Sequence, residues 1–424
     1  MVSNLVIYLD GRRAGVATQS NTGNLTFRYD ESYRRSANAT PLSLAMPLAG
    51  AEHKKRVVLP YLQGLLPDSD DALRAIAQRY SVSPRSVFAL LAQVGSDVAG
   101  AVEMRLEGEK SSDASQTRND VRIVDDTELG RMLRHVVLEY AEGVAYDDQI
   151  GHFSLAGAQP KIALHRTSEG QWAVPLDATP TTHILKPVSG RMRRIDVVEQ
   201  VTMDAARYLG NRVAPSSLHA IDGLDVFVTQ RYDRKRVEGL WHRVHQEDLC
   251  QSLSVSPAKK YQRLEGGPGI ASIAALVKSL PFERDRRDVG RSFYQAFVFN
   301  VVAGCTDAHA KNYSVMLEGA TVSLAPLYDL ITYAPYWDGK TPLLSAMSVD
   351  GEYSLSKITA ARLIEAGHRF GLGDESADIV DRARSAMVPA FESAVENLPD
   401  HITASSEVTD DLMRMLPQLP LVLS

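Results

Sequence analysis

The sequence has 424 residues, of which 44% are hydrophobic and 23% charged, and its 46 basic and 52 acidic side chains give a formal net charge of −6. This composition is typical of a globular protein with two or three domains, excludes a chain that is disordered overall, and gives no general electrostatic reason for binding nucleic acid. The two cysteines, Cys250 and Cys305, stand in apolar contexts, which argues against a disulfide framework or a zinc site and indicates core thiols in a reducing compartment.

The first apolar run, residues 5–9, is cut short by Asp10-Gly11, so we predict no secretory signal. No stretch approaches the ~18 apolar residues that a membrane span needs. We therefore expect a cytoplasmic protein that does not enter a membrane.

The N-terminal third predicts a small strand-rich domain. Residues 5–9, 14–18 and 25–29 predict strands, and residues 70–80 and 84–94 predict helices. The polar tract at residues 108–120 reads as a linker. We find no internal repeat and place the first domain at residues 1–107.

After a predicted helix at residues 127–142, the run SLAGAQPK at residues 154–161 contains small residues that allow the backbone to approach an anion closely. Its signal is weak alone, because it has one glycine and because Pro160 removes a backbone donor. A plain turn is the alternative.

Lys186 ends a short apolar strand, residues 182–187, where its amine needs a partner such as a phosphate. Asp196 could cap a helix at residues 197–209, and Glu199 near the start of this helix could form an ion pair with Lys186. The alternative is that Glu199 is exposed and only favours the helix dipole.

Residues 225–233 begin as an apolar strand and end in polar residues. This pattern suits a hinge whose backbone hydrogen-bonds a nucleobase, and it equally suits an edge strand. Three charge clusters, residues 53–56, 191–194 and 283–288, are expected to be solvated surface. The cluster at 191–194 is also placed where a protein substrate could dock.

The most informative stretch is TDAHAKN at residues 306–312, which follows an apolar segment, residues 291–304, that we expect to be a buried helix ending at Gly304. Two short strands, residues 313–317 and 321–324, predict a hairpin that returns the chain to Asp329. Asp307, Asn312 and Asp329 then have the order and spacing by which protein kinases place a catalytic Asp and two metal ligands, which indicates phosphoryl transfer.

Each of these residues has an ordinary explanation when it is taken singly. A lone Asp in a loop is usually a turn former or a helix cap, and His309 and Lys311 are more often a solvated pair. The ordered set of helix, Asp, Asn, hairpin and second Asp is what favours chemistry.

These residues resemble the HipA family of serine/threonine-protein kinases, the toxins of HipBA-type toxin-antitoxin systems. The resemblance rests on nine short runs spread over nearly the whole chain. They are GLLPDS (64–69), GSDVAGA (95–101), SLAGAQPK (154–161), TTHILK (181–186), RYDR (231–234), QEDLCQ (246–251), GGPGI (266–270), TDAHAKN (306–312) and PLYD (326–329).

The resemblance implies an ATP- and Mg²⁺-dependent kinase. It implies that Asp307 accepts the substrate proton, that Asn312 and Asp329 hold magnesium, that Ser154 is an autophosphorylation site and that Glu199 supports Lys186. Pro160 and Gln230 each stand where the best-known member has a Glu. The implied nucleotide-binding residues are Ala156, Gly157, Ala158, Gln159, Pro160, Lys161, Lys186, Gln230, Arg231, Tyr232, Asp233, His309, Lys311, Asn312, Tyr328 and Asp329.

The resemblance also implies an α+β, bilobed kinase-like fold, with an N-lobe at residues 121–235 and a mainly helical C-lobe at residues 236–424. Its implied activity is phosphorylation of a serine in an aminoacyl-tRNA synthetase such as the glutamyl enzyme, with growth arrest and persistence as the result. A HipB-like helix-turn-helix antitoxin would neutralise it, and DNA would be contacted only through that partner. The alternatives are a weak kinase acting mainly as a corepressor and a small-molecule phosphotransferase.

Overall fold

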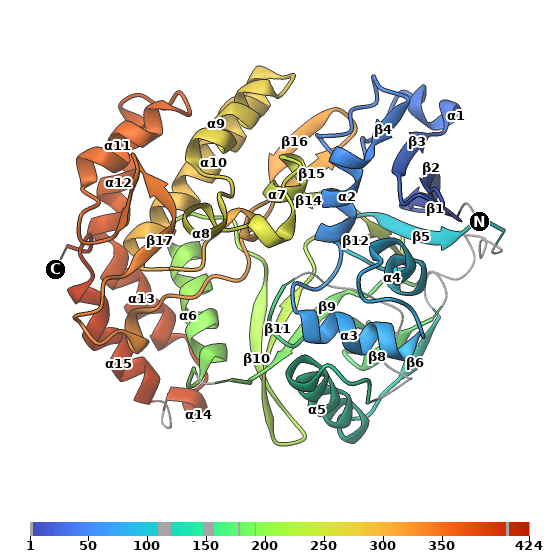
Figure 1. The fold of residues 1–424 in the computed structure, drawn as a ribbon. Coiled ribbons are helices and arrows are strands. Elements are labelled where there is room, and N and C mark those ends of the chain that lie inside the picture. Colours follow the sequence, from blue (N-terminus) through green and yellow to red (C-terminus); the bar gives the residue numbers. More distant parts are fainter. Residues whose placement is uncertain are drawn as a thin grey trace. The chain divides into compact units, whose positions relative to one another are not determined.

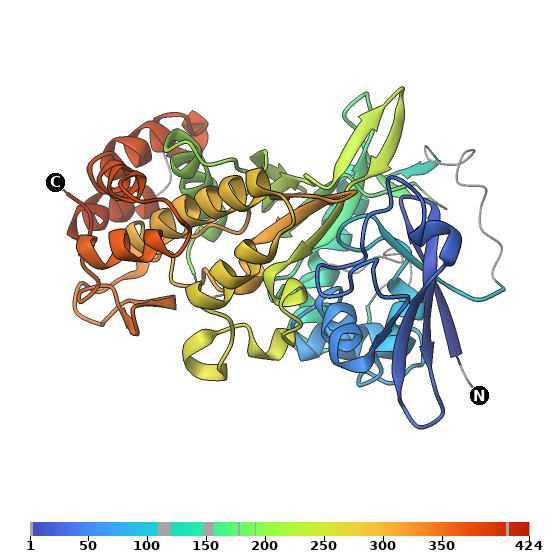
Figure 2. The ribbon, with the colours of Figure 1, turned by 90° about the horizontal axis from the view of Figure 1, so that it is seen from above.

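A computed structural model of the chain describes residues 3–108, 120–146, 157–176, 179–190, 192–403 and 407–423. The contacts divide it into two compact units, each built from several stretches of the chain. Figures 1 and 2 give the order of the elements along the chain. The first unit comprises residues 1–189, 219–258 and 316–320, and the second comprises residues 190–218, 259–315 and 321–424.

The first unit opens with a five-stranded antiparallel sheet in the order β4-β3-β2-β1-β5. Asp10 and Gly11 turn the chain between β1 and β2 with φ of 48° and 77°, the left-handed values that tight hairpin turns require. The three predicted strands are confirmed. The bounds are β1 Ser3–Leu9, β2 Arg12–Gln19, β3 Leu25–Tyr29, β4 Glu52–Lys54 and β5 Val102–Leu106.

Four helices accompany this sheet and share one hydrophobic core with it. The hydroxyls of Ser69 and Ser86 accept hydrogen bonds from the first turns of α3 and α4, so each serine sets the start of its helix. Both predicted helices are confirmed, although the second begins three residues later than expected. The bounds are α1 Glu31–Arg34, α2 Lys55–Gly64, α3 Asp70–Arg79 and α4 Val87–Val94.

A second sheet, in the order β10-β11-β9-β7-β8-β6, surrounds a separate core together with the predicted helix α5. Asp125 caps the start of α5, and Gly143, at φ 67°, ends it. The bounds are β6 Val121–Ile123, α5 Asp126–Glu142, β7 Ile162–Arg166, β8 Trp172–Pro175, β9 His183–Pro187, β10 Ser216–Ile221, β11 Leu224–Gln230, β12 Arg234–Val237, β13 Leu240–Arg243, β14 His245–Asp248 and α7 Leu249–Ser252.

The second unit is mainly helical and is organised around α10, whose last ten residues are almost all buried. Helix α6 packs against α13, and the two lie side by side in Figure 1. The bounds are α6 Ile195–Tyr208, α8 Gln262–Glu265, α9 Ile270–Ser279, α10 Glu283–Val302, β15 Ser314–Glu318, β16 Thr321–Leu324, β17 Leu344–Val349, β18 Glu352–Ser354, α11 Ala360–His368, α12 Glu375–Ser385, α13 Met387–Glu396, α14 Asp400–Thr403 and α15 Glu407–Met415. Short 3-10 turns, η1 to η4, cover Pro257–Lys259, Ala310–Asn312, Ala334–Tyr336 and Leu416–Gln418.

Two expectations about local structure were wrong. Asp196 does not cap α6: the helix begins at Ile195 after Arg194, which has φ 48°, and Asp196 lies in the first turn, where it pairs with Arg194 at 2.8 Å. The region after residue 236 is also less helical than expected, because β12 pairs with β13 and β17 pairs with β18. Local apolar periodicity is weak in such short strands, which are stabilised by their partners.

The prediction of two core thiols is confirmed. Cys250 and Cys305 are both buried and unpaired with each other. Within the described ranges, no helix is both long and apolar enough to cross a membrane. Most of the predicted linker, residues 109–119, lies outside the described residues.

Candidate functional site

The candidate site is built on the end of α10. The amide of Cys305 donates to the Asn300 carbonyl at 2.8 Å, and Gly304 adopts φ 69°, so the chain leaves the helix in a left-handed turn. A side chain at position 304 would be strained in that conformation. The predicted buried helix and its glycine exit are therefore confirmed, and they deliver residues 306–312 from a rigid platform.

Asp307 is the exposed residue of this loop, and hydrogen bonds hold its backbone in place. Its carbonyl oxygen accepts the amide of His309 at 2.8 Å and the side-chain amide of Asn312 at 2.9 Å. The hydroxyl of Tyr261 donates to its carboxylate. The loop thus fixes the main chain of Asp307 while its carboxylate stays accessible to solvent.

The residues that follow are buried. His309, Lys311 and Asn312 are 3%, 5% and 9% exposed, so the solvated pair considered for His309 and Lys311 is wrong. The ring of His309 meets the ring of Tyr261 edge to face, with 4.8 Å between the ring centres. A Lys ammonium that is this buried must have polar partners, which is consistent with a specific role for Lys311.

Hydrogen bonds connect the segment after the hairpin to the same loop. The Tyr328 hydroxyl donates to the carbonyl of Lys311 at 2.9 Å and lies 2.6 Å from the Ser314 hydroxyl. The preceding residue, Leu327, is held by the segment after α6. Its amide donates to the carbonyl of Arg212 at 2.8 Å, and its carbonyl accepts the amide of Ala214 at 2.9 Å. The predicted hairpin of β15 and β16 therefore returns the chain to the Asp307 loop.

Asp329 follows directly and adopts φ 57°, a left-handed conformation that is uncommon for residues other than glycine. Such a conformation persists only where the surrounding structure enforces it, and it is often found at functional positions. Its side chain is partly exposed. Asp307, Asn312 and Asp329 thus belong to one unit of the structure, and Tyr328 connects their two segments.

These side chains fit a magnesium site of a particular kind. Asp329 and Asn312 supply a carboxylate and an amide, the oxygen ligands that Mg²⁺ takes from proteins, and Mg²⁺ usually completes its octahedron with phosphate oxygens and waters. In the described part of the chain, no group of three or more His, Cys, Asp or Glu residues could hold a metal ion. An ion held at this site would therefore depend on a phosphate-bearing ligand.

The predicted phosphate loop and Lys strand lie in the first unit. Gly157 has φ 114°, a backbone conformation in which any other residue would be strained, so the turn before Lys161 favours glycine there. Lys186 lies on β9, opposite Phe227 of β11, and its ammonium is 5.5 Å from the centre of the Phe227 ring. Ser154 and Ala156 lie outside the described residues, whereas Ala158 and Gln159 continue the bend that begins at Gly157, and Pro160 follows it before β7.

At the predicted hinge, the side chains of Arg231 and Asp233 are engaged elsewhere. They pair with each other at 2.8 Å and are 3% and 4% exposed. The amide of Arg231 donates to the Thr182 carbonyl at 2.9 Å. Gln230 is exposed at the end of β11, and the Tyr232 hydroxyl donates to the side chain of Gln246 at 2.9 Å. The side chains of Arg231 and Asp233 therefore serve the interior of the first unit rather than a ligand.

Those two residues belong to a buried ion cluster that the sequence did not reveal, which we define as Asp97, Glu103, Arg231, Asp233, Arg234 and Arg243. Asp97 accepts from Arg234 at 2.7 Å and from Arg243 at 3.0 Å. Burial alone would raise the pKa of the Asp97 carboxyl, but the three guanidinium groups together lower it well below its usual range. Burial also lowers the pKa of Arg234 to about 10, which leaves it cationic at neutral pH.

The structure also shows the environment of Glu199 and of the basic cluster at residues 191–194 in the second unit. Glu199 is 2% exposed on α6, so the alternative of an exposed first-turn Glu is wrong. Within the basic cluster at 191–194, Arg193 pairs with Glu407 and with Asp411, the latter at 2.6 Å, and Arg194 pairs with Asp196. Arg191 lies outside the described residues. The cluster is therefore less available for docking than a solvated cluster would be.

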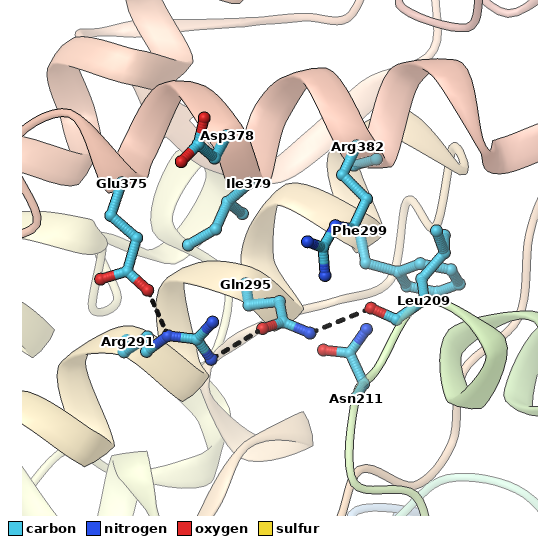
Figure 3. A pocket seen from close by; sticks show the side chains of 10 residues that line it. Leu209, Asn211, Arg291, Gln295, Phe299, Glu375, Asp378, Ile379 and Arg382 are labelled. Atoms are coloured by element: carbon cyan, nitrogen blue, oxygen red, sulfur yellow. Dashed lines mark hydrogen bonds and ion pairs between the residues drawn. The ribbon is translucent and has the colours of Figure 1, made fainter.

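The second unit also contains a pocket of about 160 Å³ that includes none of the predicted site residues. Figure 3 shows Arg291 held by Glu375 and Gln295, while Gln295 donates to the Leu209 carbonyl. Three of the pocket's polar side chains, Arg291, Gln295 and Glu375, are thus engaged with one another, and the pocket lies apart from the residues that the sequence singled out. Tyr261 was missed by sequence reasoning, although an aromatic residue shortly before the glycine-rich run 266–269 was its available signal.

Comparisons with known proteins agree with this assignment of segments. Residues 5–105 match the family model of the HipA N-terminal domain, and residues 153–391 match that of the HipA-like C-terminal domain. The chain is 34% identical over 394 residues to the protein Y4mE of Sinorhizobium fredii, covering 89% of this chain and 91% of that protein. It is 28% identical over 347 residues to the serine/threonine-protein kinase toxin HipA of Shewanella oneidensis, covering 78% and 75%.

Among solved structures, a similar fold occurs in the Shewanella oneidensis complex of HipA, HipB and operator DNA. The TM-score is 0.80 at 24% sequence identity, and the match covers 98% of this chain and 97% of that chain. This likeness confirms the predicted fold class, a mixed α and β fold with a strand-rich N-terminal region and a mainly helical C-terminal region.

Proposed function

The chain belongs to the HipA family of kinases, and from this premise we propose that it is a serine/threonine-protein kinase that uses ATP and Mg²⁺. The observation that carries the proposal is the hydrogen-bonded connection of the Asp307–Asn312 loop to Tyr328-Asp329. This connection supports the proposal because it links the loop that carries Asp307 and Asn312 to the segment that carries Asp329, the three residue types that phosphoryl transfer needs.

In this proposal Asp307 orients the acceptor hydroxyl and takes its proton during transfer. Its backbone is fixed by two hydrogen bonds to its carbonyl oxygen, so its carboxylate is presented with little freedom. Asn312 and Asp329 would hold the magnesium ion. The ion would neutralise charge on the phosphates when it is bound. His309 and Lys311 are buried and follow Asp307 closely in the sequence. They would line the space occupied by the transferred group.

The nucleotide would be bound mainly through main-chain groups and two cations. The turn at residues 156–161 would supply amides to the phosphates, and Lys161 and Lys186 would supply charge. Residues 230–232 would meet adenine through their backbone, which is why Gln230 in place of a Glu should matter little. Glu199 would support Lys186, and Ser154 would be the residue whose phosphorylation expels the phosphate loop, because a dianion there competes with ATP.

The substrate and partner follow by family likeness. We propose that the acceptor is a serine of an aminoacyl-tRNA synthetase, with the glutamyl enzyme first, and that its phosphorylation arrests growth in the cytoplasm and leads to persistence. A HipB-like helix-turn-helix antitoxin would neutralise the kinase and connect it to DNA. The support for this partner is the fold shared with a HipA that was solved with HipB and operator DNA.

The test is phosphate transfer from radiolabelled ATP by the purified chain, compared with an Asp307→Ala variant. We expect a loss of about 10³-fold or more, because a positioned base contributes roughly 10²–10⁴-fold. Asp374→Ala is a matched control, since Asp374 is an exposed residue of the same unit with φ −65°. Full labelling by Asp307→Ala would refute the assignment. ATP binding by the wild type without any turnover would favour the corepressor alternative.

A further inference from the structure

Tyr261 stands immediately before the short helix α8 and is fixed by its own backbone. Its amide donates to the Glu265 carboxylate at 3.0 Å, and its carbonyl accepts the amide of Gly267 at 3.1 Å. A β-carbon at Gly267 would lie 2.1 Å from the Lys259 carbonyl, so this tight return of the chain requires glycine. The glycine-rich run therefore holds Tyr261 in a defined place.

The neighbouring residue anchors the segment to a strand pair. The side-chain oxygen of Gln262 accepts the amide of Ser348 at 2.8 Å and its hydroxyl at 3.3 Å. Ser348 lies on β17, one of the strands that sequence reasoning missed. The segment that carries Tyr261 is thus secured by two contacts that follow the tyrosine, the tight turn at Gly267 and the bonds of Gln262 to β17.

From this position the phenol side chain reaches Asp307. Its hydroxyl donates to Oδ1 of the carboxylate, and its ring packs edge to face against His309. The contact joins residues 46 positions apart in the sequence. A hydrogen bond to one carboxylate oxygen restricts rotation about the Cβ–Cγ bond, and each oxygen of an ionised carboxylate can accept more than one hydrogen bond.

We propose that Tyr261 is a positioning residue for phosphoryl transfer, which holds Oδ1 of Asp307 so that Oδ2 faces the acceptor hydroxyl. This inference rests on the proposed function and deepens it by adding a residue outside the Asp307 loop. The acceptor hydroxyl donates its proton to Oδ2, its oxygen forms the bond to the γ-phosphorus of ATP, and ADP leaves with the electrons of the broken bond. Tyr261 keeps its own proton throughout.

The same contact is also compatible with an inhibitory role for Tyr261. If the phenol occupied the position of the acceptor hydroxyl, it would compete with substrate, and its removal would accelerate transfer. The two roles predict opposite signs for the same substitution, so they can be separated in one experiment.

The experiment compares wild type with Tyr261→Phe, which keeps the ring against His309 and removes only the hydroxyl. The readout is the rate of self-labelling from radiolabelled ATP as a function of ATP concentration. We expect a roughly 10-fold lower rate at saturating ATP with an unchanged half-saturating concentration, because misplacement of a catalytic group affects the chemical step. Tyr333→Phe, a hydroxyl deletion at a 38% exposed tyrosine of the same unit, should leave both quantities unchanged.

A rate for Tyr261→Phe equal to or above that of wild type overturns the positioning role. If the wild type labels nothing, the proposed function fails. Crystal structures of the wild type and of Tyr261→Phe then test separately whether Tyr261 positions the Asp307 carboxylate. Loss of the hydroxyl is expected to leave the Asp307 carboxylate in more than one rotamer, whereas a single unchanged rotamer overturns the inference. Equal melting temperatures of the two proteins would exclude a folding defect as the cause of a slower rate.

Discussion

The buried ion cluster of the first unit and the Asp307 loop of the second unit both contain aspartates, but they hold them in opposite environments. In the ion cluster, Asp97 and Asp233 are surrounded by guanidinium groups and are 4% exposed. In the loop, Asp307 is exposed while its backbone is fixed. Charges that neutralise one another in a protein interior are unavailable to a ligand. The comparison teaches that burial among guanidinium groups, more than residue type, distinguishes a structural carboxylate from the exposed carboxylate that we propose for catalysis.

The largest effect is expected from Asp97→Asn, which keeps the shape of the side chain and removes its charge. Arg234 and Arg243 would then be buried with less compensating charge, at a cost of about 3–5 kcal/mol in the free energy of unfolding. Urea titration measures this cost. Kinase activity per folded molecule should be unchanged. A stable variant with lost activity would reverse the assignment of the two regions.

The second effect is expected at Asn312 in the Asp307 loop. Asn312→Ala removes both the hydrogen bond to the Asp307 carbonyl and an oxygen proposed for magnesium, so we expect activity to fall by about 100-fold, or roughly 2.7 kcal/mol. Raising the magnesium concentration should recover part of it. Activity that is reduced by the same factor at every magnesium concentration would contradict a ligand role for Asn312. Unfolding free energy should change little.

The third effect concerns Glu247, a buried carboxyl of the first unit for which the described residues provide no cationic partner of the kind found in the ion cluster. Burial raises the pKa of Glu247 from 4.5 to about 7, although the amide of Leu44 donates to the carboxylate at 2.8 Å. Between these values the folded protein holds a proton that the unfolded chain has released. Stability contributed by this group is therefore lost as the pH rises from about 4.5 to 7.

Glu247→Gln should remove this pH dependence. At pH 8 the variant is expected to be more stable than wild type by about 1–3 kcal/mol, and at pH 4 the two should be similar. Urea titrations at the two pH values measure the difference. A variant that is less stable than wild type at pH 8 would mean that the ionised carboxylate has a favourable partner.

The smallest effect is expected at an exposed ion pair. Arg28 and Glu52 join β3 to β4, with side chains 72% and 40% exposed. Glu52→Gln should change the unfolding free energy by less than about 0.5 kcal/mol, because solvent screens exposed pairs. Urea titration measures this change, and Glu52→Gln serves as the exposed control for Asp97→Asn. A cost comparable to that of Asp97→Asn would contradict the importance assigned to burial.

Much of the second unit's site could be predicted because its signals are local. The apolar helix, Gly304, the hairpin at 314–324 and the spacing of Asp307 and Asn312 all lie within about 40 residues, and periodicity and turn residues report such structure directly. The start of α6 was misjudged for a local reason too. Asp196 has the residue type of a cap, yet its carboxylate pairs with Arg194.

The ion cluster and Tyr261 could not be predicted, because they depend on contacts between distant residues. Asp97 meets Arg231, Arg234 and Arg243 across more than 130 positions, and no period in the sequence reports which charges will pair. Arg231 and Asp233 were therefore assigned to nucleotide binding from their motif alone. Their burial shows that a motif residue can instead maintain the fold around a site.

The most direct measurement is the structure of the chain with Mg²⁺ and a non-hydrolysable ATP analogue. The account predicts one Mg²⁺ with Asn312 Oδ1 and an Asp329 oxygen at roughly 2.0–2.1 Å, the remaining positions held by phosphate oxygens and waters, and the terminal phosphate facing Asp307. Magnesium and triphosphate bound away from these three side chains would contradict it.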